Sequence, residues 1–403
     1  MKRKLRNKLA ILLAVLMTAM MFAGCGNKAD ETKQSQTVKE TEAVKETEAS
    51  KETKEETAGQ TEAKKTGNNQ YTDAFSIEYL DDGIKKVIDG EGRELILVPK
   101  EIDVPEEYAD ANVVRTPIEN VLFMSSTQVC MLRPLDSETV WNSVAGVNGE
   151  RDSWSFEEIK KGFDDGRIVN VGGDMGEPDY ELVQKMNPDL AFVYTGSSPQ
   201  VGVIEKFEEL GIPYAVDNEY MEQTYMGRME WLRFIAVFYN EDEKVDEIMA
   251  NAKTALDEMK ATVAGKDKPT VVYGNLYDGT VYVASKDSWV ANMIEDAGGE
   301  YLFSDIDVTG TQLSPEEFYA KAKDADIMIY SSTPEYTPDI ASIVEQAPVL
   351  ADCKPMTEGN VWQLGSSFWT GIDESHKMAV DLAAAFYPDL FPDRETTYFV
   401  KMK

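Results

Sequence analysis

The side chains that do most enzyme chemistry are scarce in this chain. Its 403 residues include a single histidine, His376, and three cysteines, Cys25, Cys130 and Cys353. Histidine-rich metal cages and Ser-His or Cys-His catalysis therefore lack the residue that they need. The sequence also lacks the G-x-S-x-G, H-E-x-x-H and G-x-x-x-x-G-K-[ST] motifs and the dinucleotide-binding fingerprint. We expect a binding protein without a metal site or a resident cofactor, and not an enzyme.

Hydroxyl, aromatic and amide side chains gather instead where short apolar segments end. If those segments are parallel strands of an α/β protein, ligands bind beyond their carboxyl ends. Aromatic faces and hydroxyls suit a large organic chelate or macrocycle, which Arg228, the cation of the set, would help to orient. For each residue the alternative is ordinary loop packing. The candidate ligand contacts are Ser125, Ser126, Tyr194, Tyr220, Arg228, Asn275, Trp289, Ser332 and Trp369.

Two sets of alternating strands and helices must position these residues. Apolar segments such as NVLFMSS and DLAFVY alternate with helical patterns over 106–222, and a second set follows over 265–403. Such alternation predicts right-handed crossovers and parallel sheets. Between the sets, 223–264 has a helical pattern that breaks near Asn240. The sequence thus predicts an α/β fold of two parallel-sheet lobes joined by a long spine helix, with a small β-hairpin appendage over 71–105.

The chain begins with a different kind of sequence. Residues 1–24 place positive charges before an apolar stretch, as a signal peptide does. Residues 25–70 are mostly Lys, Glu, Thr, Gln and Ala, which bury too little apolar surface to fold, so we expect a disordered tether. The segment MFAGC, which ends at Cys25, resembles a bacterial lipobox. This resemblance implies that Cys25 is lipidated and anchors the protein at the outer face of the cytoplasmic membrane; the alternative is an ordinary secreted protein.

The net charge of the chain excludes one class of partner, and the positions of its cysteines predict their redox state. The chain has 40 Lys and Arg against 73 Asp and Glu, a formal net charge of -33. A surface this acidic repels phosphate backbones, so we exclude nucleic acid as a partner, and we expect a monomer. Cys130 and Cys353 lie far apart in sequence. We expect two isolated, partly buried thiols, with a disulfide between them as the alternative.

A repeated unit carries a second resemblance. DYELVQKMNPDLAFVY in the first set and SPEEFYAKAKDADIMIY in the second each open with a helix cap, Asp179 or Ser314, and place a glutamate two residues later. Over about 110–390 the chain resembles the solute-binding proteins of ATP-binding cassette importers, in the helical-backbone class that delivers ferric siderophores, haem and cobalamin. The resemblance implies a cleft between the lobes, and docking of Glu181 and Glu316 to arginines of two permease subunits, with Glu317 as the alternative to Glu316.

The ligand is less closely defined than the class of protein. An iron-siderophore complex is the first expectation, and corrinoid and haem are the alternatives. Haem held by two protein ligands is disfavoured with one histidine, although Met175, Met221 and Met226 stay open as axial ligands. A surface glycan hydrolase using paired carboxylates, or an adhesin, would share the anchor and tether but would not need ligand contacts from both lobes.

Overall fold

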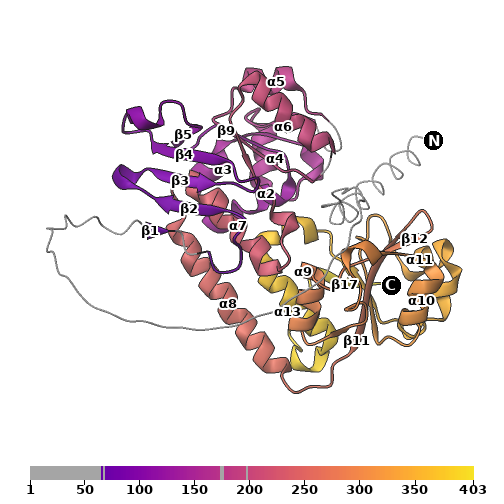
Figure 1. Ribbon diagram of the computed structural model, residues 1–403. Helices are drawn as coiled ribbons and strands as arrows, with labels where there is room; N and C mark the ends of the chain where they lie inside the picture. Colours follow the sequence, from indigo (N-terminus) through magenta and orange to yellow (C-terminus); the bar gives the residue numbers. More distant parts are fainter. Residues whose placement is uncertain (1–64, 67–68, 173–176, 197) are drawn as a thin grey trace, which may run out of the picture.

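The computed structural model describes residues 65–66, 69–172, 177–196 and 198–403 of the chain (Figure 1). The predicted signal peptide, Cys25 and nearly all of the predicted tether lie outside the described residues. Within them, Figure 1 shows two α/β lobes, a sheet at the amino-terminal side of the first lobe, and a long helix that runs past both lobes. The α/β architecture with two lobes and a spine is therefore confirmed.

The first lobe is built on a parallel sheet with the strand order β10-β9-β6-β7-β8. Strands β6, β9 and β10 are buried along their whole length, as expected for strands that helices cover on both faces. The strands are β6 (Val121–Phe123), β7 (Val144–Val147), β8 (Val169–Asn170), β9 (Leu190–Val193) and β10 (Tyr214–Val216). The helices are α2 (Ser126–Cys130), α3 (Glu138–Ser143), α4 (Glu157–Asp164), α5 (Tyr180–Met186) and α6 (Ser198–Leu210).

The second lobe has a mixed sheet in the order β14-β12-β11-β15-β16-β17, with β13 beside β11. Strands β11, β15 and β16 are parallel, but β12, β14 and β17 run antiparallel to their neighbours. The strands are β11 (Thr270–Tyr277), β12 (Thr280–Val283), β13 (Glu300–Tyr301), β14 (Gln312–Leu313), β15 (Ile327–Tyr330), β16 (Val361–Leu364) and β17 (Phe399–Lys401). The helices are α9 (Trp289–Asp296), α10 (Pro315–Ala322), α11 (Ile340–Gln346), α12 (Lys354–Thr357) and α13 (Ser375–Phe386).

A two-residue turn explains why β12 runs antiparallel to β11, where the sequence predicts a parallel sheet. Asp278 and Gly279 connect β11 to β12, with φ of 47° and 78°. Positive φ at both central residues of a two-residue loop matches the twist of an antiparallel hairpin. The strands therefore fold back on each other at this edge, while the centre of the sheet keeps the predicted parallel pairing.

The spine consists of two helices, α7 (Tyr225–Phe238) and α8 (Glu243–Val263). Every residue of α7 is buried, whereas α8 buries a stripe that includes Val245, Met249 and Leu256. The predicted break near Asn240 is present, since Asn240 has a φ of 59° between the two helices. The first helix is thus enclosed by the lobes, and the second exposes one face to solvent.

The amino-terminal appendage is larger than the predicted hairpin. It is a sheet of β1 (Lys65–Thr66), β2 (Ser76–Tyr79), β3 (Lys85–Ile88), β4 (Glu94–Pro99) and β5 (Val113–Thr116), in that order. Strand β5 pairs in parallel with β4, beyond the predicted end of the appendage at residue 105. Residues 95–98 of β4 are buried, and this strand lies in the sheet between β3 and β5.

The appendage is fixed to the first lobe and to the spine. The carboxylate of Asp89 accepts a hydrogen bond from Val216 N (3.0 Å), and Gly90 N donates to Val216 O (3.0 Å), which covers the edge of β10. The ammonium of Lys85 lies 2.9 Å from the carboxylate of Asp242, just before α8. These contacts tie the sheet to both the first lobe and the break in the spine. Across the described residues, no helix combines the length and the apolar character needed to cross a membrane.

Candidate functional site

The predicted contacts of the first lobe lie at the ends of its strands. Ser125 follows β6 and caps α2, its hydroxyl accepting a hydrogen bond from Thr127 N at 3.2 Å; Ser126 begins the helix. Tyr194 follows β9, and Tyr220 lies in the short helix η5 (Glu219–Met221) after β10. The two tyrosine rings pack edge to face with centroids 6.1 Å apart. All four predicted residues are half-buried, so part of each side chain remains open to a ligand.

The predicted contacts of the second lobe differ more in exposure. Asn275 in β11 and Ser332 after β15 are buried, and the Ser332 hydroxyl accepts a hydrogen bond from Thr337 Oγ1 (2.9 Å). Trp369 lies in the short helix η8 (Phe368–Thr370) and is half-buried, with its ring edge-on to Phe368 at 5.1 Å. Of the second-lobe set, Trp369 therefore has the aromatic surface most open to contact.

Arg228 and Trp289 are enclosed at the junction of the lobes. The guanidinium of Arg228, in the first turn of α7, is 1% exposed and lies 2.7 Å from the carboxylate of Glu219. Its central carbon is 4.7 Å from the ring centroid of Trp289, which begins α9 of the second lobe. Arg228 thus already has an acidic partner in its own lobe and an aromatic cover from the other lobe. Glu219 stands nine residues before Arg228, and a buried arginine needs such a partner.

A second carboxyl group lies next to this pair. Asp217, directly after β10, is 1% exposed and accepts a hydrogen bond from Glu219 N (3.0 Å). Burial, with the nearby Glu219 carboxylate, raises the pKa of Asp217 well above its usual range, and Arg228 opposes the shift. The end of β10 therefore holds two acidic side chains against one cation.

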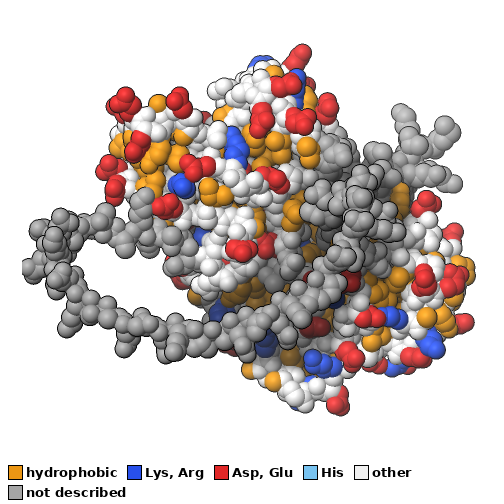
Figure 2. All heavy atoms as spheres, in the orientation of Figure 1, with side chains coloured by type: hydrophobic (Ala, Val, Ile, Leu, Met, Phe, Trp, Pro, Cys, Tyr) orange, Lys and Arg blue, Asp and Glu red, His pale blue; other side chains and the backbone are white. Residues whose placement is uncertain are grey.

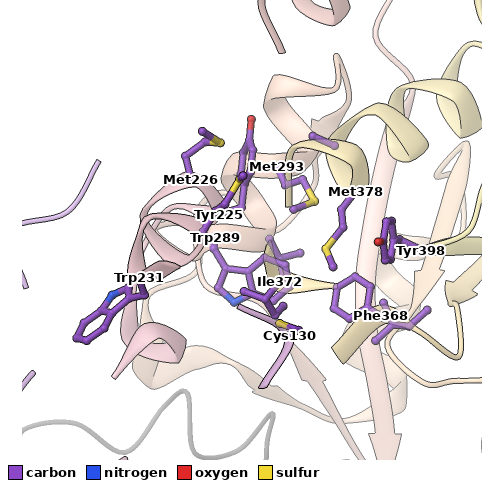
Figure 3. Close-up of a cluster of buried hydrophobic side chains, with 14 of the residues drawn as sticks. Cys130, Tyr225, Met226, Trp231, Trp289, Met293, Phe368, Ile372, Met378 and Tyr398 are labelled. Carbon is purple, nitrogen blue, oxygen red and sulfur yellow. The ribbon is translucent and has the colours of Figure 1, made fainter. Parts of the chain in front are cut away.

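A cluster of buried apolar side chains fills the junction between the lobes, and both lobes contribute to it. Figure 3 shows Cys130 of the first lobe, Tyr225 of the spine, and Trp289 and Phe368 of the second lobe within one cluster. The rings of Trp289 and Phe368 lie 6.0 Å apart. Because one buried cluster includes both lobes and the spine, separating the lobes would expose apolar surface to water.

A second arginine pair crosses the junction. Arg133, in the short helix η3 (Arg133–Leu135), donates to both carboxylate oxygens of Asp373, from Nε at 2.8 Å and from Nη2 at 2.6 Å. Asp373 belongs to the short helix η9 (Ile372–Glu374) of the second lobe, and its side chain is 1% exposed. Burial raises the pKa of Asp373 to about 6 although Arg133 opposes the shift. No local pattern in the sequence reveals this pair, because 240 residues separate its members.

The remaining candidates for metal or haem chemistry are dispersed. Cys130 and Cys353 are free, as predicted, and both are buried, more fully than the sequence suggested. Burial lowers the pKa of His376 to about 4, and its Nδ1 is buried without a hydrogen-bond partner. Met226 is buried in the junction cluster and Met221 is 58% exposed, while Met175 lies outside the described residues. In the part of the chain that the structure describes, no three His, Cys, Asp or Glu side chains are grouped to hold a metal ion.

The two proposed docking glutamates are both exposed at helix starts. Glu181 is the second residue of α5, which Asp179 caps by accepting from Leu182 N at 3.0 Å. In α10, Glu317 accepts hydrogen bonds from the backbone and hydroxyl of Ser314 (2.8 and 2.7 Å), and these bonds lower the pKa of Glu317. Glu317 is therefore engaged in capping its own helix, whereas Glu316 is exposed and lies outside this capping box.

The face of the molecule in Figure 2 carries acidic side chains over both lobes, in keeping with the net charge of -33. A crevice of about 660 Å³ opens beside the first turn of α7, between residues 69–74 and 221–224. Glu222 at this crevice accepts from Trp231 Nε1 at 2.8 Å and from the hydroxyl of Thr72. The crevice thus lies where the appendage meets the spine, and none of the predicted ligand contacts lines it.

Comparison with known sequences finds relatives along most of the chain. A profile of the family described as periplasmic binding protein matches residues 139–367. An uncharacterized lipoprotein of Methanocaldococcus jannaschii is 30% identical over 79% of this chain and 78% of its own length. A second uncharacterized lipoprotein of that organism is 26% identical and covers 97% of this chain and 99% of itself.

Several solved structures share the fold at low identity. An ABC transporter substrate-binding protein from Listeria monocytogenes has a TM-score of 0.53 at 15% identity, covering 67% of this chain and 99% of its own. A periplasmic haem-binding protein from Roseiflexus has a TM-score of 0.52 at 18% identity, covering 68% and 99%. A Helicobacter pylori protein described as a Ni-His complex has a TM-score of 0.54 at 17% identity, covering 77% and 90%. Identities this low show a common fold and do not show a common ligand.

Proposed function

Because the chain belongs to the periplasmic binding protein family, which serves ABC importers, we propose that it captures an iron-siderophore complex between its lobes and delivers it to such an importer. The observation that carries the proposal is the set of half-buried aromatic and hydroxyl groups at the strand ends of both lobes, among them Tyr194, Tyr220 and Trp369. Aromatic faces of this kind grip large organic ligands. The single histidine supports a chelated metal over a bare ion, since protein nitrogen ligands are scarce.

The ion pair between Arg228 and Glu219 indicates which net charge of the chelate the site favours. A free arginine would favour a strongly anionic complex, but Glu219 balances the charge of Arg228, and Asp217 lies beside the pair. A ferric chelate of low net charge therefore fits this junction better than one with several free negative charges. Corrinoids also need no protein ligand to their metal, so they remain the alternative within the same class of importer.

A titration panel tests the ligand. The mature protein is titrated with several ferric siderophores, cobalamin, haem, Ni-histidine, and Mn²⁺ or Zn²⁺, and its tryptophan fluorescence is followed. Trp289 and Trp369 lie on the second lobe near the predicted site, so a bound chelate should quench their emission. The strongest response should come from a ferric siderophore of low charge. Binding of a bare ion at micromolar concentration, with no response to any chelate or macrocycle, would overturn the proposal.

We further propose that lipidated Cys25 holds the protein at the outer face of the cytoplasmic membrane. Two relatives named as lipoproteins support this location, and the order of signal peptide, cysteine and tether suits it. The substitution Cys25→Ser should release the protein from membranes into the medium. A variant that stays in the membrane fraction would refute the anchor.

The docking role of Glu181 and Glu316 is proposed on their exposure and their place in the two lobes. Glu181→Ala and Glu316→Ala should leave ligand affinity unchanged and lower ligand uptake, the double variant most of all, because surface charges chiefly set encounter rate and register. Glu317→Ala is the matched control, since Glu317 is bound to Ser314 and should affect helix stability and not uptake. If affinity fell with Glu181→Ala or Glu316→Ala, these acids would belong to the ligand site.

A further inference from the structure

The polypeptide that leads to Arg133 is one continuous unit with the predicted ligand residues of the first lobe. Ser125 and Ser126 begin α2, and the chain continues through Met131 and Leu132 in helical conformation into η3. Met131 N donates to Gln128 O at 3.2 Å, and Leu132 N donates to Val129 O at 3.1 Å. Because backbone hydrogen bonds connect these turns, a displacement of Arg133 would also displace Ser125 and Ser126.

The second lobe repeats this arrangement around Asp373. Trp369 lies in η8, and Asp373 follows four residues later in η9. Gly371 N donates to Phe368 O at 3.2 Å, and Glu374 N donates to Gly371 O at 2.8 Å, so η8 and η9 also form one hydrogen-bonded unit. A displacement of Asp373 would therefore also displace Trp369.

Contacts between the two units cross the lobe junction directly. In addition to its two bonds to Asp373, Arg133 places Nη2 3.4 Å from Thr370 O and 3.5 Å from the carboxylate of Glu374. The hydroxyl of Ser155, from the first lobe, donates to Thr370 Oγ1 at 3.3 Å. The fork of an arginine on both oxygens of one carboxylate fixes direction as well as distance.

We propose that Arg133 and Asp373 are positioning residues, whose ion pair holds the ligand-facing ends of the two lobes at one separation and so sets the size of ligand that both lobes contact together. This inference rests on the proposed function, because the groups that the pair positions are the predicted ligand contacts. The chain passes between the lobes once, through the spine, so their relative rotation also depends on non-covalent contacts across the junction. The apolar junction cluster resists separation of the lobes, but dispersion contacts lack the directionality of a two-bond ion pair.

The two members of the pair are not equivalent. Arg133 is 38% exposed and keeps Glu374 as a neighbour if Asp373 is neutralised, whereas Asp373 is buried and would have no cation if Arg133 were removed. Asp373→Asn keeps the side-chain shape and weakens the pair without leaving an unpaired buried charge. Arg133→Lys keeps the positive charge but loses the two-bond geometry. Together the two variants separate the effect of the charge of the pair from the effect of its two-bond hydrogen-bond geometry.

The experiment measures lobe separation without any ligand. Spin labels are placed on one exposed residue of each lobe, at Lys161→Cys in α4 and Glu345→Cys in α11, while Cys130 and Cys353 are buried against labelling. The distance distribution between the labels, from pulsed electron paramagnetic resonance, is compared in the wild-type background, Asp373→Asn and Arg133→Lys. We expect both variants to broaden the distribution or shift it to longer distances.

The matched control is a buried pair that stays inside one lobe. Arg394 donates to Asp381 at 2.8 and 2.5 Å, and Asp381 is fully buried in α13. Asp381→Asn should lower the stability of the protein and leave the distance between the labels unchanged. An unchanged distribution in Asp373→Asn and Arg133→Lys, or equal broadening in Asp381→Asn, would overturn the inference.

Ligand binding distinguishes this inference from the proposed function. In Asp373→Asn, the ferric siderophore that binds the wild-type protein most tightly should lose about tenfold in affinity. Smaller chelates should lose less than chelates that span both lobes. If the wild-type protein bound no chelate but the label distances changed as expected, the proposed function would fall and the control of lobe separation would stand. If Asp373→Asn bound every ligand as the wild type does, the pair would play no part in setting the site.

Discussion

Arg228 and Arg133 both meet a carboxylate at the junction of the lobes, but the surroundings of the two pairs differ. Arg228 and Glu219 lie nine residues apart in the first lobe and the start of the spine, with side chains 1% and 4% exposed. Arg133 and Asp373 come from different lobes, and Arg133 is 38% exposed. The first pair neutralises charge where β10 ends, and the second joins two bodies that could otherwise rotate.

Both are arginine–carboxylate pairs, so the residue types of an ion pair do not determine what it does; its position in the fold does. Trp289 covers Arg228 from the second lobe, yet this contact is a ring face without a fixed hydrogen bond. Arg133 instead makes two hydrogen bonds to a carboxylate that is fixed in the other lobe. We therefore expect loss of the first pair to act on stability, and loss of the second to act on both stability and lobe geometry.

The largest effect should come from removing the cation of the first pair. Arg228→Met leaves Glu219 buried without a partner and Asp217 beside it, so we expect the free energy of unfolding to fall by about 5 kcal/mol. Denaturant unfolding measures this loss. The double variant Arg228→Met/Glu219→Leu should recover most of it, because no unpaired charge is then buried. A loss below 1 kcal/mol in Arg228→Met would remove the contrast between the two pairs.

Removal of Arg133 should cost less. Arg133→Met leaves Asp373 buried without its cation, but the raised pKa of Asp373 allows it to take up a proton more readily, so we expect a loss of about 3 kcal/mol at neutral pH. Hydrogen exchange should accelerate in α2, η3 and η9 together, since the contact between the lobes is lost. Acceleration confined to one lobe would contradict the role assigned to this pair.

A smaller effect should come from His376, beside the second pair, on acidification. His376 lies two residues after Glu374, and its pKa is lowered to about 4, below the usual value of 6.5. The unfolded chain binds a proton as the pH falls through 6.5, and the folded chain does so only near 4, so the contribution of His376 to stability decreases over this window. The expected loss is about 2 kcal/mol between pH 7 and pH 5.

The matched variant is His376→Gln, which cannot take up this proton. The difference in unfolding free energy between wild type and His376→Gln should change by that amount between pH 7 and pH 5, and hydrogen exchange near η9 should follow it. Exchange at η5 and the start of α7 should not differ between the two proteins. A difference that is independent of pH would show that His376 titrates normally in the folded protein.

Local patterns in the sequence were sufficient to predict the helices and strands of both lobes and several of the residues at which they begin or end. Apolar segments alternating with helical stretches predicted both lobes, and the polar interval around Asn240 predicted the break in the spine. The caps Asp179 and Ser314 were identified from residue type alone. These features depend on neighbours within a few residues, which is the range over which sequence periodicity and capping act.

Local sequence patterns did not predict how far each candidate site residue is exposed to solvent. Ser125, Tyr194 and Trp369 are half-buried at strand ends or in the short helices after them, whereas Arg228 and Trp289 are enclosed. A sequence places a residue near a strand end but does not state which neighbours cover it.

The sequence by itself determined a histidine-poor, acidic α/β chain with two lobes, a spine and a lipobox-like cysteine, because composition and short-range periodicity specify these properties. Tertiary structure alone decided the extent of the appendage sheet, the antiparallel edges of the second lobe, and the meeting of Arg133 with Asp373. Those features arise from contacts between segments far apart in the chain, and the last of them crosses 240 residues. Such a contact depends on how both lobes pack against the spine, so no local pattern records it.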